Sequence, residues 1–117
     1  MAWSNHGYEG FRGSNRADLF PTLLELAGID NPHKVDGKSL VPLLKENAFK
    51  IRPLFWHYPH YGNQGGDPSA IIRKGDWKLI HYFEDGKHEL YNLRKDIGEK
   101  IDVFEKNIKI GRTLSNE

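Results

Sequence analysis

Cysteine is absent from this 117-residue sequence. Its absence excludes disulfides, thiolate zinc sites and a cysteine nucleophile, and it leaves the redox compartment undetermined. Long hydrophobic runs are lacking too. None approaches the roughly 20 apolar residues of a membrane span, and the N-terminal stretch MAWSNHGYEGFRGSN lacks the apolar core of a signal peptide.

An excess of charge of one sign is also missing. The sequence has 17 basic and 16 acidic residues, which give a formal net charge of +1. Such a chain has no long-range field that would draw it to nucleic acid or to a membrane surface. Either partner would need a local basic patch.

The length predicts a single domain, and apolar residues, 38% of the total, suffice for one modest core. Residues 1–16 are rich in glycine, asparagine and arginine and show no periodicity. We therefore expect a flexible N-terminal segment there. Residues 17–117 are expected to form the folded domain.

The segment DLFPTLLELAGI, residues 18–29, predicts a helix. Asp18 suits its N-cap, Pro21 falls in its first turn, and Gly28 suits the position just after its end. Apolar residues cover a wide arc of this helix, so it should pack on more than one side. Ser39 is the predicted cap of a second, shorter helix, SLVPLLKEN.

Beyond Arg52 the pattern changes to that of strands. RPLFWHY is strand-like, and SAIIRKGDWKLIHYFEDGKHELYNL, residues 69–93, is typical of a three-stranded meander. Gly75-Asp76 fits a two-residue turn of type II′, and Asp85-Gly86 fits one of type I′.

Two tight turns would determine the register of the meander. The opposite pairs would be Ile72–Leu79, Ile71–Ile80, Tyr82–Glu89 and Ile80–Tyr91. Both faces would then carry apolar side chains, whereas a sheet with one face in water alternates cleanly. We therefore expect cover on both faces of the sheet.

The tail places Ile97, Ile101, Phe104 and Ile108 at helical spacing, and Gly111 should end that helix. This helix would cover one face of the sheet, and the two short helices are the candidates for the other. The predicted fold class is α+β, a small antiparallel sheet of three to four strands packed with two to three helices.

Histidines are the first candidates for chemistry. His57 and His60 have HxxH spacing, but zinc sites with this spacing usually place both rings on one face of a helix. Residues three apart in an extended segment point to opposite faces, and Pro59 interrupts this one. Packing of aromatic and histidine side chains at a sheet edge is therefore favoured over a metal site.

The rest of the sequence contains no complete catalytic set. No serine lies in a GxSxG elbow, the neighbouring carboxylates suit a turn and a solvated helix face, and phosphate-binding glycine motifs are absent. IIRKGDWKLIHYF mixes basic and aromatic residues as a stacking surface for nucleic acid does, yet strand alternation would split them between two faces. We predict no catalytic residue, no metal ligand, and no nucleic-acid or membrane partner.

Three stretches of the sequence resemble one known family. ADLFPTLLELAGIDNPHKVDGKSLVPLLK, RPLFWHYPHY and AIIRKGDWKLIHYFEDGKHELYNLRKDIGEK occur in the order found in the C-terminal portion of the sulfatases, and they cover about residues 17–100. The resemblance implies a helix that closes a large α/β catalytic domain, then a small subdomain with an antiparallel sheet and a helix. The chain would thus be the C-terminal subdomain of a sulfatase, inactive alone, and its partner would be the catalytic domain.

Sulfatase chemistry uses a formylglycine made in a C/S-x-P-x-R motif and a divalent metal, usually calcium, that polarises the sulfate. Neither that motif nor the family's Asp-Asp metal motif occurs in this sequence. The resemblance therefore implies calcium, formylglycine and a sulfated substrate for an intact enzyme only. It also implies a periplasmic, extracellular or lysosomal location for that enzyme.

In this family, loops of the C-terminal subdomain lie near the rim of the substrate pocket. The resemblance thus implies substrate contacts from the GNQGGDP loop and from His57, His60, Tyr61, Arg73 and Lys74. Imidazole and phenol groups can hydrogen-bond sugar hydroxyls or sulfate, and the two cations would add positive charge. The alternative is that FWHYPHY only packs the subdomain against its neighbour. A second class of function also stays open, a stand-alone interaction module that binds sulfated or anionic glycans.

Overall fold

The computed structural model describes residues 14–45, 47, 52–62 and 65–117. The contacts divide the chain into two compact units, residues 1–52 and 53–117, and each unit is considered by itself. Most of the predicted flexible segment lies outside the described residues, and the predicted domain over residues 17–117 stays a prediction. In the described part of the chain, no helix is long and apolar enough to cross a membrane.

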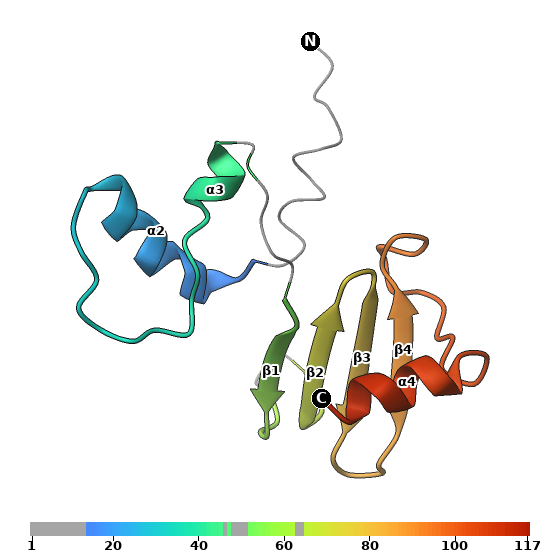
Figure 1. The fold of residues 1–117 in the computed structure, drawn as a ribbon. Coiled ribbons are helices and arrows are strands. Elements are labelled where there is room, and N and C mark those ends of the chain that lie inside the picture. Colours follow the sequence, from blue (N-terminus) through green and yellow to red (C-terminus); the bar gives the residue numbers. More distant parts are fainter. Residues whose placement is uncertain (1–13, 46, 48–51, 63–64) are drawn as a thin grey trace. The chain divides into compact units, whose positions relative to one another are not determined.

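The first unit contains a turn of 3-10 helix and two short α-helices (Figure 1). The turn η2 spans Arg16–Asp18, α2 spans Leu19–Leu26 and α3 spans Val41–Leu44. Both predicted helices are present, although each is shorter than its sequence pattern. Ser39 precedes α3, and its Oγ accepts the N–H of Val41 at 3.2 Å. Gly28 follows α2 with a φ of 69°, the left-handed conformation that glycine adopts without strain at helix ends.

Asp18 has a role other than the predicted cap, because its side chain makes no capping bond to α2. Asn15 provides the cap instead, and its Oδ1 accepts the N–H of Ala17 in η2. The Asp18 carboxylate accepts the backbone N–H groups of Asn15 and Lys38, both at 2.7 Å, and forms an ion pair with the Arg52 guanidinium at 2.5 Å. Asp18 is fully buried. One carboxylate thus holds together three stretches of the first unit.

A close approach beside Asp18 explains the glycine of the DGKSL sequence. The Thr22 hydroxyl donates to the Asp18 carbonyl at 2.5 Å and accepts the N–H of Leu40 at 2.9 Å. A Cβ atom on Gly37 would lie 1.9 Å from the carbonyl oxygen of Ala17. The loop before α3 therefore comes this close to η2 only because residue 37 has no side chain.

The second unit is built on a four-stranded antiparallel sheet in the order β1-β2-β3-β4 (Figure 1). The strands span Leu54–Tyr58 (β1), Ser69–Lys74 (β2), Trp77–Tyr82 (β3) and His88–Asn92 (β4). The predicted α+β fold with a small antiparallel sheet is confirmed. The first hairpin also has the predicted register, since Ile72 pairs with Leu79 and Ile71 with Ile80. Gly75 supplies the positive φ of its tight turn, 58°.

The predicted register of the second hairpin is wrong by two residues. Ile80 pairs with Glu89 rather than with Tyr91, and Lys78 pairs with Tyr91. Because side chains alternate with a period of two, this shift leaves every side chain on its predicted face.

The physical reason for the shift lies in the turn. A type I′ turn needs a positive φ at both central residues, but of Asp85 and Gly86 only Gly86 has one, 67°. The Asp85 carboxylate instead accepts the N–H of Lys87 at 2.8 Å, which is an Asx-type turn. The connection between the strands is therefore a longer loop over residues 83–87.

The predicted C-terminal helix is wrong at both ends. The helix α4 spans Ile108–Ser115, and Gly111 lies inside it rather than at its end. Ile97 and Ile101 lie in irregular chain and are largely exposed. The Asp96 carboxylate accepts the backbone N–H of Ile101 at 2.8 Å and so offers this stretch an alternative to helical hydrogen bonds.

The helix α4 covers one face of the sheet, which we call the helix face (Figure 1). Its buried core consists of Ile72, Leu79, Leu90 and Leu114. A Cβ atom on Gly111 would lie 2.5 Å from the Phe104 ring, so the missing side chain lets α4 approach that ring closely. The predicted cover of one sheet face by the C-terminal helix is thus present, although the helix is shorter.

The opposite face, which we call the open face, has no described helix of the second unit on it. The pairing register assigns it these side chains: Leu54, Trp56, Tyr58, Ser69, Ile71, Arg73, Lys78, Ile80, Tyr82, Glu89 and Tyr91. The prediction that the two short helices cover this face concerns the arrangement of the two units and stays a prediction.

Candidate functional site

The five predicted site residues do not gather at one place in the second unit. His60 and Tyr61 follow the end of β1, which pairs with the Ser69 end of β2. Arg73 and Lys74 lie at the other end of β2. At a rise of 3.2–3.4 Å per residue, roughly 15 Å of strand separates the two groups.

His57 lies on the helix face and packs against aromatic rings. Its ring centroid is 5.4 Å from that of Phe83, which in turn lies 5.6 Å from His81. His60 instead approaches Tyr58 edge-on, with centroids 6.5 Å apart. The two HxxH rings thus have different neighbours, and this supports the packing interpretation of His57.

Tyr61 connects two loops at one end of the sheet. Its hydroxyl donates a hydrogen bond to the Glu84 carboxylate in the loop over residues 83–87. Beside it, the N–H of Gly62 donates to the carbonyl of Gly66 at 3.3 Å. We call this region, where the segments after β1 and after β3 meet, the loop end of the sheet.

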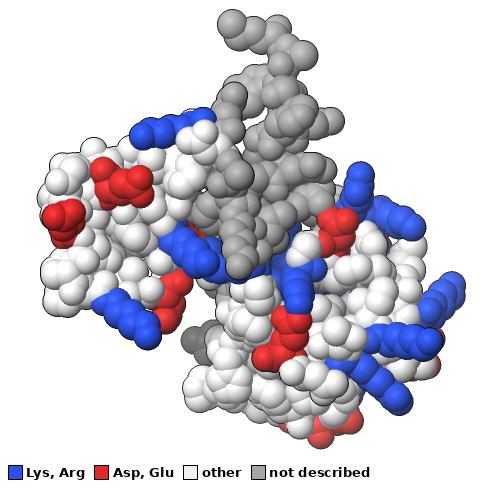
Figure 2. All heavy atoms as spheres, in the orientation of Figure 1, with Lys and Arg blue, Asp and Glu red and all other residues white. Residues whose placement is uncertain are grey.

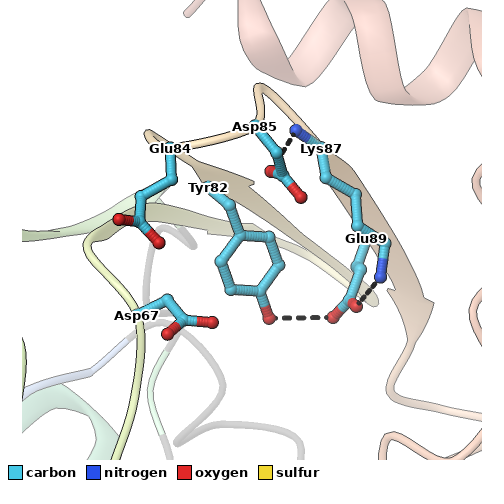
Figure 3. A pocket seen from close by; sticks show the side chains of 6 residues that line it. All are labelled: Asp67, Tyr82, Glu84, Asp85, Lys87 and Glu89. Carbon is cyan, nitrogen blue, oxygen red and sulfur yellow. Dashed lines mark hydrogen bonds and ion pairs between the residues drawn. The ribbon is translucent and has the colours of Figure 1, made fainter.

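A cavity of about 240 Å³ opens at the loop end. It is lined by Asp67, Tyr82, Glu84, Asp85, Lys87 and Glu89 (Figure 3). We call it the acidic cavity. Figure 3 shows the Tyr82 ring in its centre, with the Asp67 and Glu84 carboxylates on one side and Glu89 on the other.

Glu89 is the centre of a hydrogen-bond network in the acidic cavity. Its carboxylate accepts bonds from Lys87 Nζ at 2.7 Å, Tyr91 Oη at 2.9 Å and Tyr82 Oη at 3.0 Å. The hydrogen bond from Lys87, followed by those from the two tyrosines, holds the pKa of Glu89 below its usual value. Burial and the nearby Glu89 charge raise the pKa of both tyrosines, so both stay protonated donors at neutral pH.

The charge of the acidic cavity limits what it can bind. Four carboxylates and one lysine line it, so a sulfate group would be repelled there. Carboxylates that are not fully engaged accept hydrogen bonds from hydroxyl groups. The cavity therefore suits neutral hydroxyl groups rather than an anion.

A second hollow, of about 650 Å³, lies along β1 and reaches the open face. It is lined by Phe55, Trp56, His57, Tyr58, Ile71, Arg73, Lys78, Leu93 and Glu99. We call it the aromatic groove. The side chains of Trp56 and Tyr58 are 42% and 48% exposed, so their rings are accessible from this groove.

The two cations of the aromatic groove have different partners. Arg73 and Lys78 are directly opposite each other on β2 and β3. Lys78 forms an ion pair with Glu99 at 2.6 Å. The Nε of Arg73 is buried and has no hydrogen-bond partner among the described residues. Lys74, by contrast, points to the helix face and forms an ion pair with Glu117.

Sequence reasoning identified Arg73 but missed the residues around it. The tight turn at Gly75-Asp76 places Lys78 opposite Arg73, so this pair could have been found from the predicted register. Five of the six residues of the acidic cavity belong to the β3–β4 hairpin, but the predicted register gave no reason to expect Asp67 beside them. On the face drawn in Figure 2, basic and acidic side chains both occur on each unit.

These features define the class of fold: an α+β chain with a four-stranded antiparallel sheet, one face of which is covered by a helix. The family model described as N-sulphoglucosamine sulphohydrolase, C-terminal, matches residues 14–115, and the chain belongs to this family of sulfatase C-terminal domains.

Individual relatives agree with the family. A sulfatase from Formosa agariphila is 37% identical in an alignment of 103 residues, and the match covers 77% of this chain and 18% of the relative. A Δ4,5-hexuronate-2-O-sulfatase from Bacteroides thetaiotaomicron is 38% identical in an alignment of 90 residues, and the match covers 74% of this chain and 18% of the relative. A solved structure of a protein with its substrate D-glucosamine-2-N,6-O-disulfate superposes with a TM-score of 0.71 at 29% identity, over 85% of this chain and 22% of that one. The chain thus spans about a fifth of the length of the proteins it matches.

Calcium, which the family implies for an intact enzyme together with formylglycine, does not fit the residues that the structure describes. Among the residues that the structure describes, no group of three or more His, Cys, Asp or Glu side chains could hold a metal ion. The acidic cavity is no exception, because the Glu89 carboxylate in it is already bonded to Lys87 and two tyrosines.

Proposed function

We propose that this chain acts as the C-terminal subdomain of a sulfatase and supplies scaffold and part of the substrate-pocket wall. The observation that carries the proposal is the family match over residues 14–115. It is supported by relatives whose names describe sulfatases of hexuronate and N-acetylglucosamine. The substrate of the intact enzyme is then a sulfated sugar, and residues outside this chain cleave its ester.

Within that wall, the loop end of the sheet forms part of the pocket rim. His60 and Tyr61 are both exposed, and both belong to a segment that the Tyr61–Glu84 hydrogen bond anchors to the next loop. An exposed imidazole on an anchored segment can donate to a sugar hydroxyl or a sulfate oxygen without further ordering of the backbone. His57 is exposed as well, but its ring lies against Phe83, so we assign it to packing at the edge of the sheet rather than to the rim.

The first test is an assay of the 117-residue chain on an aryl sulfate in the presence of calcium. We expect no turnover, because no described residue set combines a nucleophile with a metal site. Turnover above the blank that persists through repurification would refute the proposal.

The second test concerns the rim, in a sulfatase that carries this subdomain together with its catalytic domain. Replacing His60 by Ala should lower kcat/KM on the sulfated sugar by about 10-fold or more, as is common when a hydrogen bond to the substrate is removed. His33→Ala is the matched control, because His33 is exposed in the first unit. An unchanged kcat/KM for His60→Ala at unchanged stability would remove the rim role.

A further inference from the structure

The strand β1 is at one edge of the sheet (Figure 1), and the register determines which of its backbone groups face outward. Residues 68 and 83 form a hydrogen-bonded pair between β2 and β3, since the N–H of Phe83 donates to the carbonyl of Pro68 at 3.0 Å. Hydrogen-bonded pairs recur every second residue, so the odd-numbered residues of β2 bond to β1, where their partners are even-numbered. Phe55 and His57 therefore direct their backbone N–H and C=O groups away from the sheet.

The other edge of the sheet, along β4, is covered within the unit. The N–H of Leu90 donates to Asp102 Oδ1 at 3.0 Å, and its carbonyl accepts the N–H of Val103 at 2.9 Å. No described residue makes such bonds to the backbone of Phe55 or His57. A strand edge with free backbone groups is a template on which a further strand can pair. In the described part of the chain, β1 is thus the edge at which the sheet can be extended.

The side chains of β1 also lack cover. From Phe55 to Tyr58 all four are exposed, and they alternate between the two faces of the sheet. Hollows border the strand on both faces, the aromatic groove and one of about 410 Å³ that reaches the helix face beside Leu114. Natural sheets often protect an exposed edge with charged side chains, and residues 54–58 contain none. Pairing with another strand would therefore bury apolar surface as well as satisfy the backbone.

Two prolines make the outer edge of β1 self-complementary. Pro53 and Pro59 occupy the next outward positions on either side of Phe55 and His57, and proline has no N–H to donate. The outward donors are therefore arranged symmetrically about Trp56. A second copy of β1, turned by half a rotation about an axis at Trp56, meets each of these N–H groups with a carbonyl, and both hydrogen-bond ladders end at the same prolines.

We propose that β1 joins two copies of this chain, which pair as antiparallel strands about a two-fold axis at Trp56. Phe55 of each copy lies opposite His57 of the other and exchanges both backbone hydrogen bonds with it, and Trp56 lies opposite its counterpart. No charged side chains meet across this pairing, and aromatic side chains directly opposite each other stabilise it. The two four-stranded sheets then form one continuous sheet. This association does not depend on the sulfatase function proposed above.

Sedimentation equilibrium of the 117-residue chain over a wide range of concentration tests the association, and we expect a reversible equilibrium between monomer and dimer. His57→Pro removes an outward N–H that β2 does not use, so the symmetric dimer loses two hydrogen bonds and its dissociation constant should rise about 10-fold or more. His57→Ala is the matched control, because it removes the same ring but keeps the N–H, and it should raise the constant less. Amide spectra show whether both variants keep the sheet. A chain that stays monomeric throughout, or equal effects of the two variants, would overturn the proposal.

Single cysteines test the register, because the chain has no cysteine of its own. Trp56→Cys places two thiols at a pair whose Cα atoms are about 4.5 Å apart, which a disulfide can span. Tyr58→Cys is the matched control. Tyr58 lies on the same face with similar exposure, 48% against 42%, but its counterpart would lie about 13 Å away along the strands.

Oxidised glutathione serves as the oxidant for both cysteine variants. Trp56→Cys should form the covalent dimer about 10-fold faster than Tyr58→Cys or more, because only the first pair of thiols is held together. Equal rates, or a dimer that Trp56→Cys does not trap, would overturn the proposed pairing. Neither result bears on the His60→Ala assay, which tests the pocket rim.

Discussion

Glu89 and Arg73 lie on the same open face of one sheet, yet their charges have opposite surroundings. Glu89 accepts hydrogen bonds from three side chains, whereas the buried Nε of Arg73 has no partner among the described residues. A charge that already has hydrogen-bond partners within the protein contributes to the stability of the fold. This difference is why we treat Glu89 as a structural residue and Arg73 as one that the fold does not need to keep charged.

The largest effect is expected where a paired charge is fully buried, at Asp18 in the first unit. Asp18→Ala leaves the Arg52 guanidinium and two backbone N–H groups without their acceptor. Breaking such a buried pair typically costs about 3–5 kcal/mol. Urea denaturation followed by circular dichroism of the first unit's helices measures the loss. A change below about 1 kcal/mol would show that pairing of the charge is not what holds this unit.

Glu89→Ala should have the next largest effect, because Glu89 is only partly exposed and accepts three hydrogen bonds. Leaving its donors unsatisfied should cost about 1–3 kcal/mol in the free energy of unfolding. The control is Glu105→Ala, which removes an exposed carboxylate from the same unit. Equal stability of the two variants would contradict the view that the acidic cavity is a structural wall.

Acid should weaken both paired carboxylates. Burial opposes the effect at Asp18, but hydrogen bonds from Lys38, Asn15 and Arg52 lower its pKa overall, and the pKa of Glu89 is also lowered. A lowered folded-state pKa contributes stability that is present above the unfolded pKa and is lost as the pH falls through the folded one. The stability gap between the wild type and Glu89→Ala should therefore narrow below about pH 4. Denaturation midpoints at pH 7 and pH 3 test this, and a gap that stays constant would contradict it.

The smallest effect on stability should come from Arg73→Gln. This change removes a charge that has no ion-pair partner among the described residues, and it removes the repulsion between that charge and Lys78. The free energy of unfolding should stay within about 1 kcal/mol of the wild type or rise slightly. Thermal denaturation at low and moderate salt measures this change in the free energy of unfolding. A loss as large as that of Glu89→Ala would mean that Arg73 is a structural residue and that the comparison between the two charges fails.

Local sequence determined much of the sheet but not its second turn. At Gly75-Asp76 the glycine alone supplies the required φ, so turn type and register followed from the sequence. At Asp85-Gly86 the aspartate side chain competes for the backbone N–H of Lys87, and the loop lengthens. Periodicity cannot reveal such a competition, because it concerns one hydrogen bond rather than a pattern.

The C-terminal helix was misplaced for a related reason. Two of the isoleucines that suggested a helix, Ile97 and Ile101, lie between Asp96 and Asp102, whose carboxylates accept backbone N–H groups in irregular chain. Gly111, which suggests a helix end, is needed where α4 meets Phe104. Side-chain to backbone bonds and close contacts of this kind depend on tertiary neighbours that a sequence pattern does not contain.

The candidate site residues named from the sequence stay a prediction. The sequence singled out Tyr61, which makes a loop contact, and Arg73, which lines a hollow in the second unit. The sequence did not show that these residues lie at opposite ends of the sheet, because that depends on the antiparallel register of β1 and β2. The acidic cavity was missed altogether, since its carboxylates are ordinary turn and strand residues until the fold brings them together.

The bond from the Asn15 backbone to Asp18 has a practical consequence for anyone who shortens this chain from its beginning. Asn15 supplies both the cap of η2 and one of the three groups that hold the buried carboxylate. A chain that starts after Asn15 would lose both the cap of η2 and this hydrogen bond to Asp18. A chain that starts before Asn15 would keep both, so residue 15 sets the boundary for trimming.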